Sequence, residues 1–243
     1  MPINQPSWDR LYERAASQAG HFTTRQAAEA GYSPPLLHKY VANGKIARVR
    51  RGVYRLVHFP ASEDEDLVVH WLWSDREGVF SHETALVRHG LSDLLPHQVE
   101  MTVPLSWSRR RLRVPKGLLL HYADLRSADR GWHGPVPMTR AARTVLDCAA
   151  ENVSPEFIEQ AIRQGVQRGL FAADEVASAA YGVTPAPVLV PCVPTRSQTL
   201  PSVYKSLTSD VAVVSIADCC LQQKESRHER HRAARRGDHP SRD

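Results

Sequence analysis

The stretch GHFTTRQAAEAGYSPPLLHKYVANGKIARVRRGVYRLV (residues 20–57) decides the fold of the N-terminal part of the chain. Thr23 or Thr24 can cap a short helix, because a hydroxyl oxygen can accept one of the unpaired N–H groups of the first turn. Ser33 can cap another helix, with Pro34 in the first turn, where a missing N–H costs nothing. The stretch therefore predicts two short helices that are separated by a glycine turn.

A basic hairpin is predicted after these helices. Residues 46–49 and 53–57 form two runs rich in β-branched side chains, and Arg50, Arg51 and Gly52 separate them. An additional helix is predicted before residue 20 from apolar side chains at helical spacing, namely Trp8, Leu11, Tyr12, Ala15 and Ala19. Three helices followed by a hairpin predict a winged helix-turn-helix domain over residues 1–60.

The charge is distributed unevenly along the chain, although the net charge is only +5. Residues 1–60 hold nine Lys or Arg and three Asp or Glu, which gives +6. Residues 61–182 hold thirteen and seventeen, which gives −4, and residues 183–243 hold nine and six, which gives +3. A small basic domain beside a larger acidic segment indicates a module that binds a polyanion.

The middle segment, residues 61–182, mixes helices with a few strands. Helices are predicted after Ser81, Thr139 and Ser154, and after a capping box at residues 62–65; QVEMTVP and LLLHYADL are predicted strands. The predicted fold class is therefore α+β, with a winged helix-turn-helix followed by a mixed α/β domain. Residues 183–243 contain several prolines and only one of the seventeen aromatics, Tyr204, so they are predicted to be a disordered tail.

The overall composition excludes several classes of protein. The chain is 42% hydrophobic and 23% charged, which is typical of globular proteins. No apolar run approaches the roughly 20 residues of a membrane helix, and the N-terminal residues do not resemble a secretory signal. The four cysteines lack the spacing of a disulfide framework or a zinc site. These observations predict a cytoplasmic protein with no membrane partner.

Several motifs in order resemble a known family. The stretch quoted above is followed by SHETALVRHGLSDLLP, MTVP, RRRLRVP and TRAARTVLDC, and together these motifs resemble the AbiEi-type antitoxins of bacterial type IV toxin–antitoxin systems over about residues 18–180. The resemblance implies a winged-helix domain, a larger antitoxin domain and repression of the protein's own promoter through DNA repeats. It also implies a nucleotidyltransferase-like toxin, countered without a stable complex.

Eight residues are predicted to contact double-stranded DNA. No Asp or Glu occurs between Gly31 and Ser62, and an unneutralised basic surface repels itself unless phosphates neutralise it. The exposed face of the third helix is expected to read base edges. The residues predicted to contact DNA are His38, Lys39, Asn43, Lys45, Arg48, Arg50, Arg51 and Arg55.

The sequence predicts no enzyme activity, cofactor or metal ion. Ser81, His82 and Glu83 are adjacent, and neighbouring helical residues do not face one another, so a cap at the helix start explains them better than a catalytic relay. His82 and His89 are two turns apart, too far to share a metal without other ligands. Glu100 lacks the nearby lysine of a restriction-type nuclease strand.

Two alternatives to a DNA-binding antitoxin stay open at this point. One is a DNA-processing enzyme with a nuclease-like middle domain, and the other is a transcriptional regulator that senses a ligand. The basic run at residues 109–116 also has two interpretations, a loop that contacts DNA or a solvated turn.

Overall fold

The computed structural model describes residues 5–151 and 153–176. The described part of the chain divides into two compact units: residues 5–88 with Leu95–Arg140, and His89–Leu94 with the described residues from Ala141 onward. The tail predicted over residues 183–243 lies outside the described residues.

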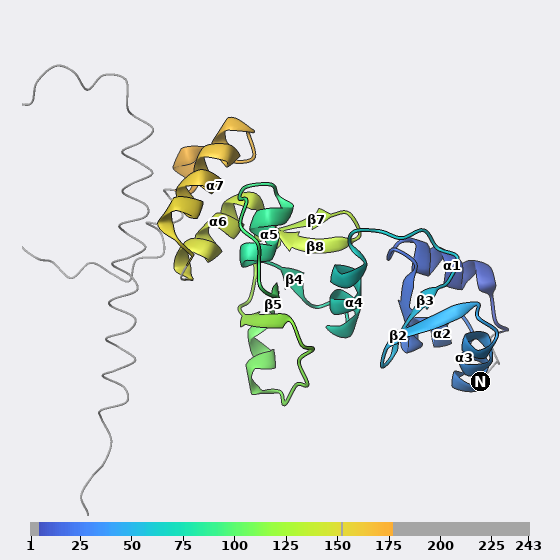
Figure 1. Cartoon of the computed structure of the whole chain (residues 1–243). Helices are drawn as coiled ribbons and strands as arrows, with labels where there is room; N and C mark the ends of the chain where they lie inside the picture. Colours follow the sequence, from blue (N-terminus) through green and yellow to red (C-terminus); the bar gives the residue numbers. More distant parts are fainter. Residues whose placement is uncertain (1–4, 152, 177–243) are drawn as a thin grey trace, which may run out of the picture. The chain divides into compact units, whose positions relative to one another are not determined.

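The first unit begins with three helices and a small antiparallel sheet (Figure 1). Strand β3 lies in the centre of the sheet, between β1 and β2. In the register, Phe22 of β1 and Arg48 of β2 both pair with Tyr54 of β3. The elements are α1 (Trp8–Ala16), β1 (His21–Thr23), α2 (Thr24–Glu29), α3 (Pro34–Ala42), β2 (Ile46–Arg50) and β3 (Val53–Leu56).

The three predicted helices and the hairpin are present, and strand β1 is an additional element. Helix α2 has a reciprocal cap, because Thr23 Oγ1 accepts the Gln26 N–H at 3.2 Å and Gln26 Oε1 accepts the Thr23 N–H at 2.8 Å. Ser33 is at the N-cap of α3, but its side chain makes no capping hydrogen bond, so that expected contact is wrong. Gly44 follows α3 with φ +68°, as expected for a helix that ends in a left-handed residue.

The helices and the sheet enclose a small hydrophobic core. Phe22 is fully buried and stacks on Tyr54 with 5.8 Å between ring centroids. Leu37 anchors α3 with 1% of its surface exposed. The buried members of this core are Leu11, Ala15, Phe22, Ala27, Ala30, Tyr32, Leu37, Ile46 and Leu56.

The remainder of the first unit contains a mixed five-stranded sheet in the order β6-β5-β4-β8-β7. Pairs β5–β6 and β4–β8 are parallel, whereas β4–β5 and β7–β8 are antiparallel. The elements are α4 (Glu65–Trp73), β4 (Val79–Phe80), α5 (His82–Arg88), β5 (Val99–Val103), η1 (Leu105–Arg109), β6 (Leu118–Tyr122), η2 (Ser127–Asp129), β7 (Arg130–His133) and β8 (Val136–Thr139). The predicted mixture of helices and strands is confirmed.

The longer strands, β5 and β6, coincide with the predicted ones. Strands β1, β4, β7 and β8 contain two to four residues each, which is too short for the alternation of apolar and polar side chains to be recognised. The capping box predicted at residues 62–65 is wrong, because α4 begins only at Glu65 and its N-cap is Asp64. Half of the expected pairing remains, since Glu65 Oε1 accepts the Ser62 N–H at 3.3 Å.

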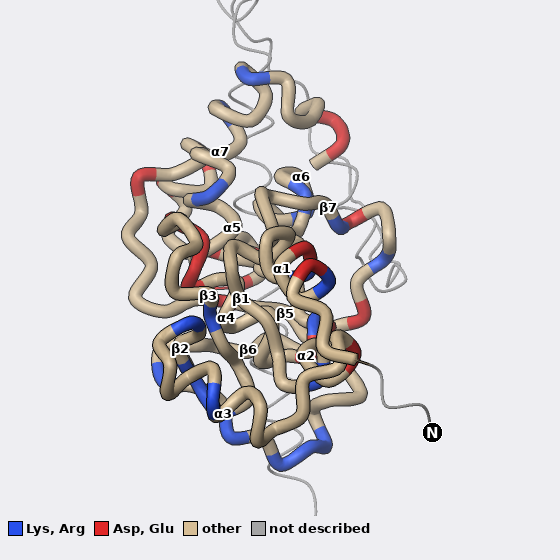
Figure 2. The backbone as a smooth tube through the Cα atoms, turned by 90° about the vertical axis from the view of Figure 1, so that its right-hand side faces the viewer, with Lys and Arg blue, Asp and Glu red and all other residues tan. Residues whose placement is uncertain are grey.

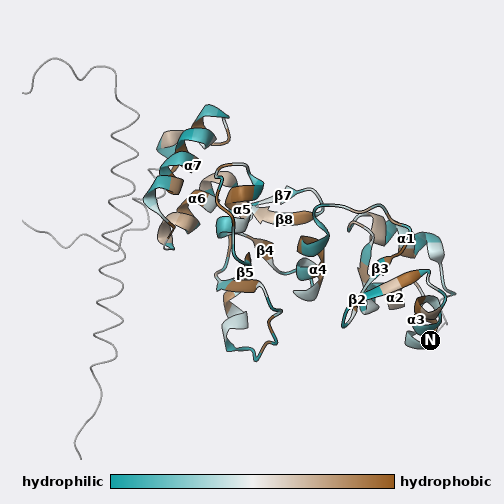
Figure 3. Ribbon diagram, in the orientation of Figure 1, coloured by the Kyte–Doolittle hydropathy of each residue, from teal (hydrophilic) through white to brown (hydrophobic). Residues whose placement is uncertain are grey.

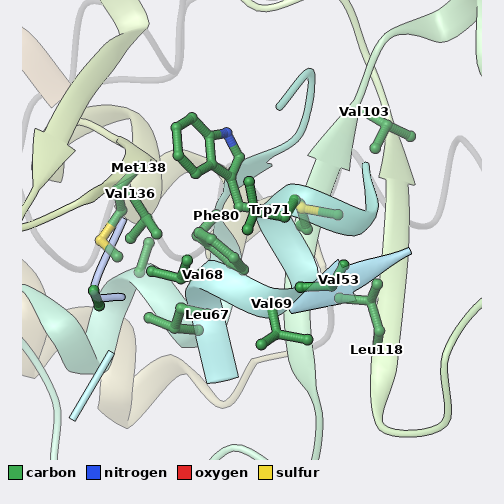
Figure 4. Close-up of a cluster of buried hydrophobic side chains, with 14 of the residues drawn as sticks. Val53, Leu67, Val68, Val69, Trp71, Phe80, Val103, Leu118, Val136 and Met138 are labelled. Carbon is green, nitrogen blue, oxygen red and sulfur yellow. The ribbon is translucent and has the colours of Figure 1, made fainter. Parts of the chain in front are cut away.

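Helix α4 is apolar along most of its length and lies in the larger core of the first unit (Figure 4). Its buried side chains pack with Val53 of β3 and with Phe80, Met101 and Met138 of the five-stranded sheet. Figure 3 shows the hydrophobic character of β5 and β8. A Cβ added at Gly78 would overlap the side chain of Met101, so a larger residue there would require Met101 to move.

The second unit, as far as it is described, contains α6 (Ala141–Ala150) and α7 (Pro155–Gln167). Both helices agree with the sequence prediction. Phe171 packs directly on Gly165, so that a larger residue there would overlap its ring. Arg168 donates to the carbonyls of His89 at 2.7 Å and Gly90 at 2.9 Å. None of the described helices has the length and apolar character needed to cross a membrane.

Candidate nucleic-acid interface

Helix α3 presents the polar residues that were predicted to read bases. His38 and Lys39 are exposed, and Asn43 is exposed at the C-cap. Leu37 faces the core, and Val41 is half-buried against it. The apolar and polar sides of α3 are therefore separated.

Aromatic rings hold α3 against the core. Tyr40 stacks on Trp8 with 5.9 Å between centroids and meets Tyr32 edge-on at 5.4 Å. Burial and the neighbouring Tyr40 raise the pKa of Tyr32 to about 12, so its hydroxyl stays protonated at neutral pH. Lys45 lies with Nζ 5.4 Å from the centre of the Tyr40 ring and links the end of α3 to the start of β2.

The hairpin carries the four arginines among the eight residues predicted to contact DNA. Its register shifts between Arg48 and Arg50, and Gly52 adopts φ +81° at the turn. Arg48 and Arg51 are exposed, whereas Arg50 is half-buried. Among the described residues, no hydrogen-bond partner is found for Arg50 Nη1, which is buried. The hairpin thus presents two exposed arginines and one that is partly enclosed.

Arg55 differs from the other cations of the hairpin because it is paired. Its guanidinium lies 2.7 Å from Glu65 Oε1 and donates to the carbonyls of Leu56 at 3.2 Å and Phe59 at 3.0 Å. The hydrogen bond from Arg55 outweighs burial and holds the pKa of Glu65 below its ordinary value. The structure thus places all eight predicted residues on α3, on the hairpin or between them, and it uses Arg55 to join the hairpin to α4.

Lys and Arg positions gather along β2 and beside α3 on the backbone (Figure 2). No acidic residue lies in the sequence between Gly31 and Ser62 to offset them. A second basic segment, residues 109–116, begins at the last residue of η1, and its Arg110 lies 4.6 Å from the ring centre of Trp107. The four arginines of this segment are exposed, which fits either of its two interpretations.

At the junction of β4 and α5, the contacts of a group of polar residues differ from two expectations drawn from the sequence. Ser81 was expected to cap α5, but its hydroxyl instead bonds to Thr102 Oγ1 at 2.7 Å and to Nδ1 of His82 at 2.9 Å. The side chains of Ser81 and His82 therefore do meet, because His82 has φ +53° and is not in a regular helical turn. His121 of β6 lies beside them and was not recognised in the sequence.

Carboxylates beside this group have shifted pKa values. Burial opposes the charge on Glu100, yet the nearby His121 imidazole and the hydrogen bond from the Glu83 N–H hold its pKa below the ordinary value. Burial and the nearby Glu100 raise the pKa of Glu83. The group thus combines an ionised carboxylate with two imidazoles.

Comparisons with known proteins find a family similarity in the N-terminal part of the chain. Residues 9–57 match the family model described as "Transcriptional regulator, AbiEi antitoxin". The match confirms the resemblance drawn from the sequence over these residues. No curated protein sequence matches the chain. The crystal structure of the RV2827C protein from Mycobacterium tuberculosis matches with a TM-score of 0.44 and 13% identity, over 74% of this chain and 75% of that chain.

Proposed function

We propose that the chain is an AbiEi-type antitoxin that binds the repeats of its own promoter and represses its operon, and the family match of residues 9–57 supports this proposal. The observation that carries this proposal is the surface shared by α3 and the hairpin, where exposed polar and basic side chains occur without acidic neighbours in the sequence. The order of elements supports a winged helix-turn-helix, in which α2 and α3 form the helix pair and β2 with β3 forms the wing.

The two parts of this surface have different roles in the proposal. Helix α3 enters the major groove, where His38, Lys39 and Asn43 contact base edges. Arg48 and Arg51 of the hairpin contact phosphates or the minor groove, because flexible cations at a hairpin suit the backbone better than a fixed base pattern. Lys45 and Arg50 add positive charge at the edge of the same surface. Arg55 would have to leave Glu65 to join them.

The finer parts of the proposal concern the rest of the chain. The domain boundaries near residues 60 and 182 separate the DNA-binding domain, an antitoxin domain without enzyme activity, and a tail. The antitoxin domain counters a nucleotidyltransferase-like toxin without forming a stable complex. The sequence resemblance supports this part, and the mixed sheet of the first unit is the structured region available for it.

A mobility-shift titration tests the DNA-binding part. The full chain is titrated against a fragment of its own upstream region and against random DNA of equal length, over a series of salt concentrations. We expect tighter binding to the upstream fragment and an affinity that falls steeply with salt. Equal, salt-independent binding to both DNAs would refute the repressor proposal. Coexpression with the proposed nucleotidyltransferase-like toxin tests the antitoxin part separately.

A further inference from the structure

Three side chains that are distant in the sequence converge in the five-stranded sheet region. His82 begins α5, Glu100 lies in β5 and His121 lies in β6. One potential ligand atom from each lies within 4.8 Å of the other two. Their backbones explain the convergence, because β5 and β6 are parallel neighbours and His121 pairs with Thr102, two residues after Glu100 on the same face of β5.

Hydrogen bonds hold the ligand groups in place from outside. His82 Nδ1 bonds to Ser81 Oγ at 2.9 Å, so Nε2 is the nitrogen with which His82 would bind a metal. The Glu100 carboxylate accepts the Glu83 N–H at 3.0 Å. Metal-binding histidines commonly use their second ring nitrogen in this way, and such partners fix the ring and the tautomer.

The burial and spacing of the three side chains are not explained by a single ion pair. The His82 residue is 7% exposed, and the side chains of His121 and Glu100 are 17% and 13% exposed. The imidazole rings of His82 and His121 are stacked with centroids 3.6 Å apart and planes 15° apart. His121 Nε2 is 3.7 Å from Glu100 Oε2, beyond hydrogen-bond distance. An ion pair would account for one imidazole beside Glu100 but not for two.

We propose that His82, Glu100 and His121 bind one divalent transition-metal ion of the Zn²⁺ class and leave a further coordination position open. Two imidazole nitrogens and one carboxylate oxygen are a typical ligand set for such an ion, with metal–ligand distances of about 2.0–2.2 Å. Imidazole ligands favour these ions over Mg²⁺ and Ca²⁺. Because the two ring planes are nearly parallel, metal binding requires the rings to tilt from the stacked arrangement until both Nε2 lone pairs point to one ion.

This site departs from the expectation that the chain holds no metal. That expectation considered His82 with His89 in the same helix, and the structure instead supplies Glu100 and His121 from two strands. The open position would take a water molecule or an anionic ligand. The site shares no residue with the DNA-binding surface, so either proposal can fail without the other.

Cobalt titration tests the site, because Co²⁺ occupies zinc sites and its visible absorption reports the ligand geometry. The full chain is used with His228, His231 and His239 changed to Gln, so that these imidazoles do not contribute to binding. After treatment with a chelator, this parent protein is expected to bind one equivalent of Co²⁺, which Zn²⁺ displaces. Competition with a coloured chelator then gives the Zn²⁺ affinity.

Three single variants of this parent locate the site. His121→Gln and Glu100→Gln are expected to weaken Zn²⁺ binding by more than about 100-fold. Removing a residue that only supports a metal ligand costs up to about 100-fold in affinity, and removing a ligand itself should cost more. His58→Gln is the matched control, because His58 is exposed outside the group, and it should bind as the parent does.

Thermal melts separate loss of metal from loss of folding. Without metal, both ligand variants should melt as cooperatively as the parent, and added Zn²⁺ should raise the Tm of the parent and of His58→Gln only. Equal Zn²⁺ affinity in the parent and in both ligand variants, or no binding by the parent, would overturn the proposal.

Discussion

The surface of α3 and the hairpin and the histidine group of the five-stranded sheet are built in opposite ways. The first collects mostly exposed side chains from one continuous stretch of the chain, residues 38–55, whereas the second brings together one buried and two half-buried side chains at positions 82, 100 and 121. An exposed, like-charged surface adds little to folding and depends on a partner to neutralise it. A buried polar group is costly unless each member is satisfied by its neighbours or by a ligand. Function at the two regions should therefore fail through different substitutions.

The largest expected effect comes from the core that supports α3 and the hairpin. Phe22→Ala should lower the free energy of unfolding by about 3–5 kcal/mol, because Phe22 is fully buried and stacked on Tyr54. Urea denaturation measures this change. Val49→Ala is the control, since Val49 is 46% exposed in β2 and should change stability by less than about 0.5 kcal/mol. Similar changes for both variants would contradict the assignment of the core.

Removing a side chain that is proposed to read bases should affect DNA binding without affecting stability. Lys39→Ala or Asn43→Ala is expected to cost about 1–3 kcal/mol in binding to the promoter fragment and much less on random DNA. Paired titrations of the two DNAs measure the difference. If the affinity for both DNAs fell equally, these residues would contact phosphates rather than bases.

The Arg55–Glu65 pair gives a smaller effect that separates pairing from DNA contact. Glu65→Gln should reduce stability by about 1 kcal/mol, the upper range for a partly exposed ion pair, and should not weaken DNA binding. Because the folded-state pKa of Glu65 is lowered, its contribution is complete above its ordinary pKa and is lost as the pH falls through the folded value. Denaturation of parent and variant at pH 7 and pH 3 checks this, and the difference should shrink at the lower pH.

The smallest expected effect is a pH dependence from His21 and His70. Burial lowers the pKa of both, and Arg50 lowers that of His70 further against the opposing charge of Asp66. The unfolded chain therefore binds more protons than the folded chain below about pH 6.5, and stability should fall as the pH is lowered through that range. Urea midpoints between pH 5.5 and 7.5 measure the trend. A midpoint that rose on acidification would contradict it.

The two regions also differ in how far the sequence predicts them. The hairpin and α3 are predictable because their signals are local: charges, turn glycines and a helical apolar stripe within one stretch of sequence. The environments of Arg50 and Arg55 are not predictable from the sequence, because the residues around them come from other elements. Glu65, which pairs with Arg55, is an example. The histidine group requires the parallel pairing of β5 with β6, which no local pattern specifies. Even the contact of Ser81 with His82 depends on a positive φ that the sequence does not signal.

One titration tests the central claim, that α3 and the hairpin form the DNA-binding surface. Arg48→Ala/Arg51→Ala is compared with Arg10→Ala/Arg14→Ala, which removes the same charge from exposed positions of α1, on promoter and random DNA at several salt concentrations. The hairpin pair should weaken binding to both DNAs and reduce the salt slope by about one unit for each phosphate that is no longer bound, while the α1 pair should bind almost as the parent does. Equal effects of the two pairs, or no effect of the hairpin pair, would contradict the claim.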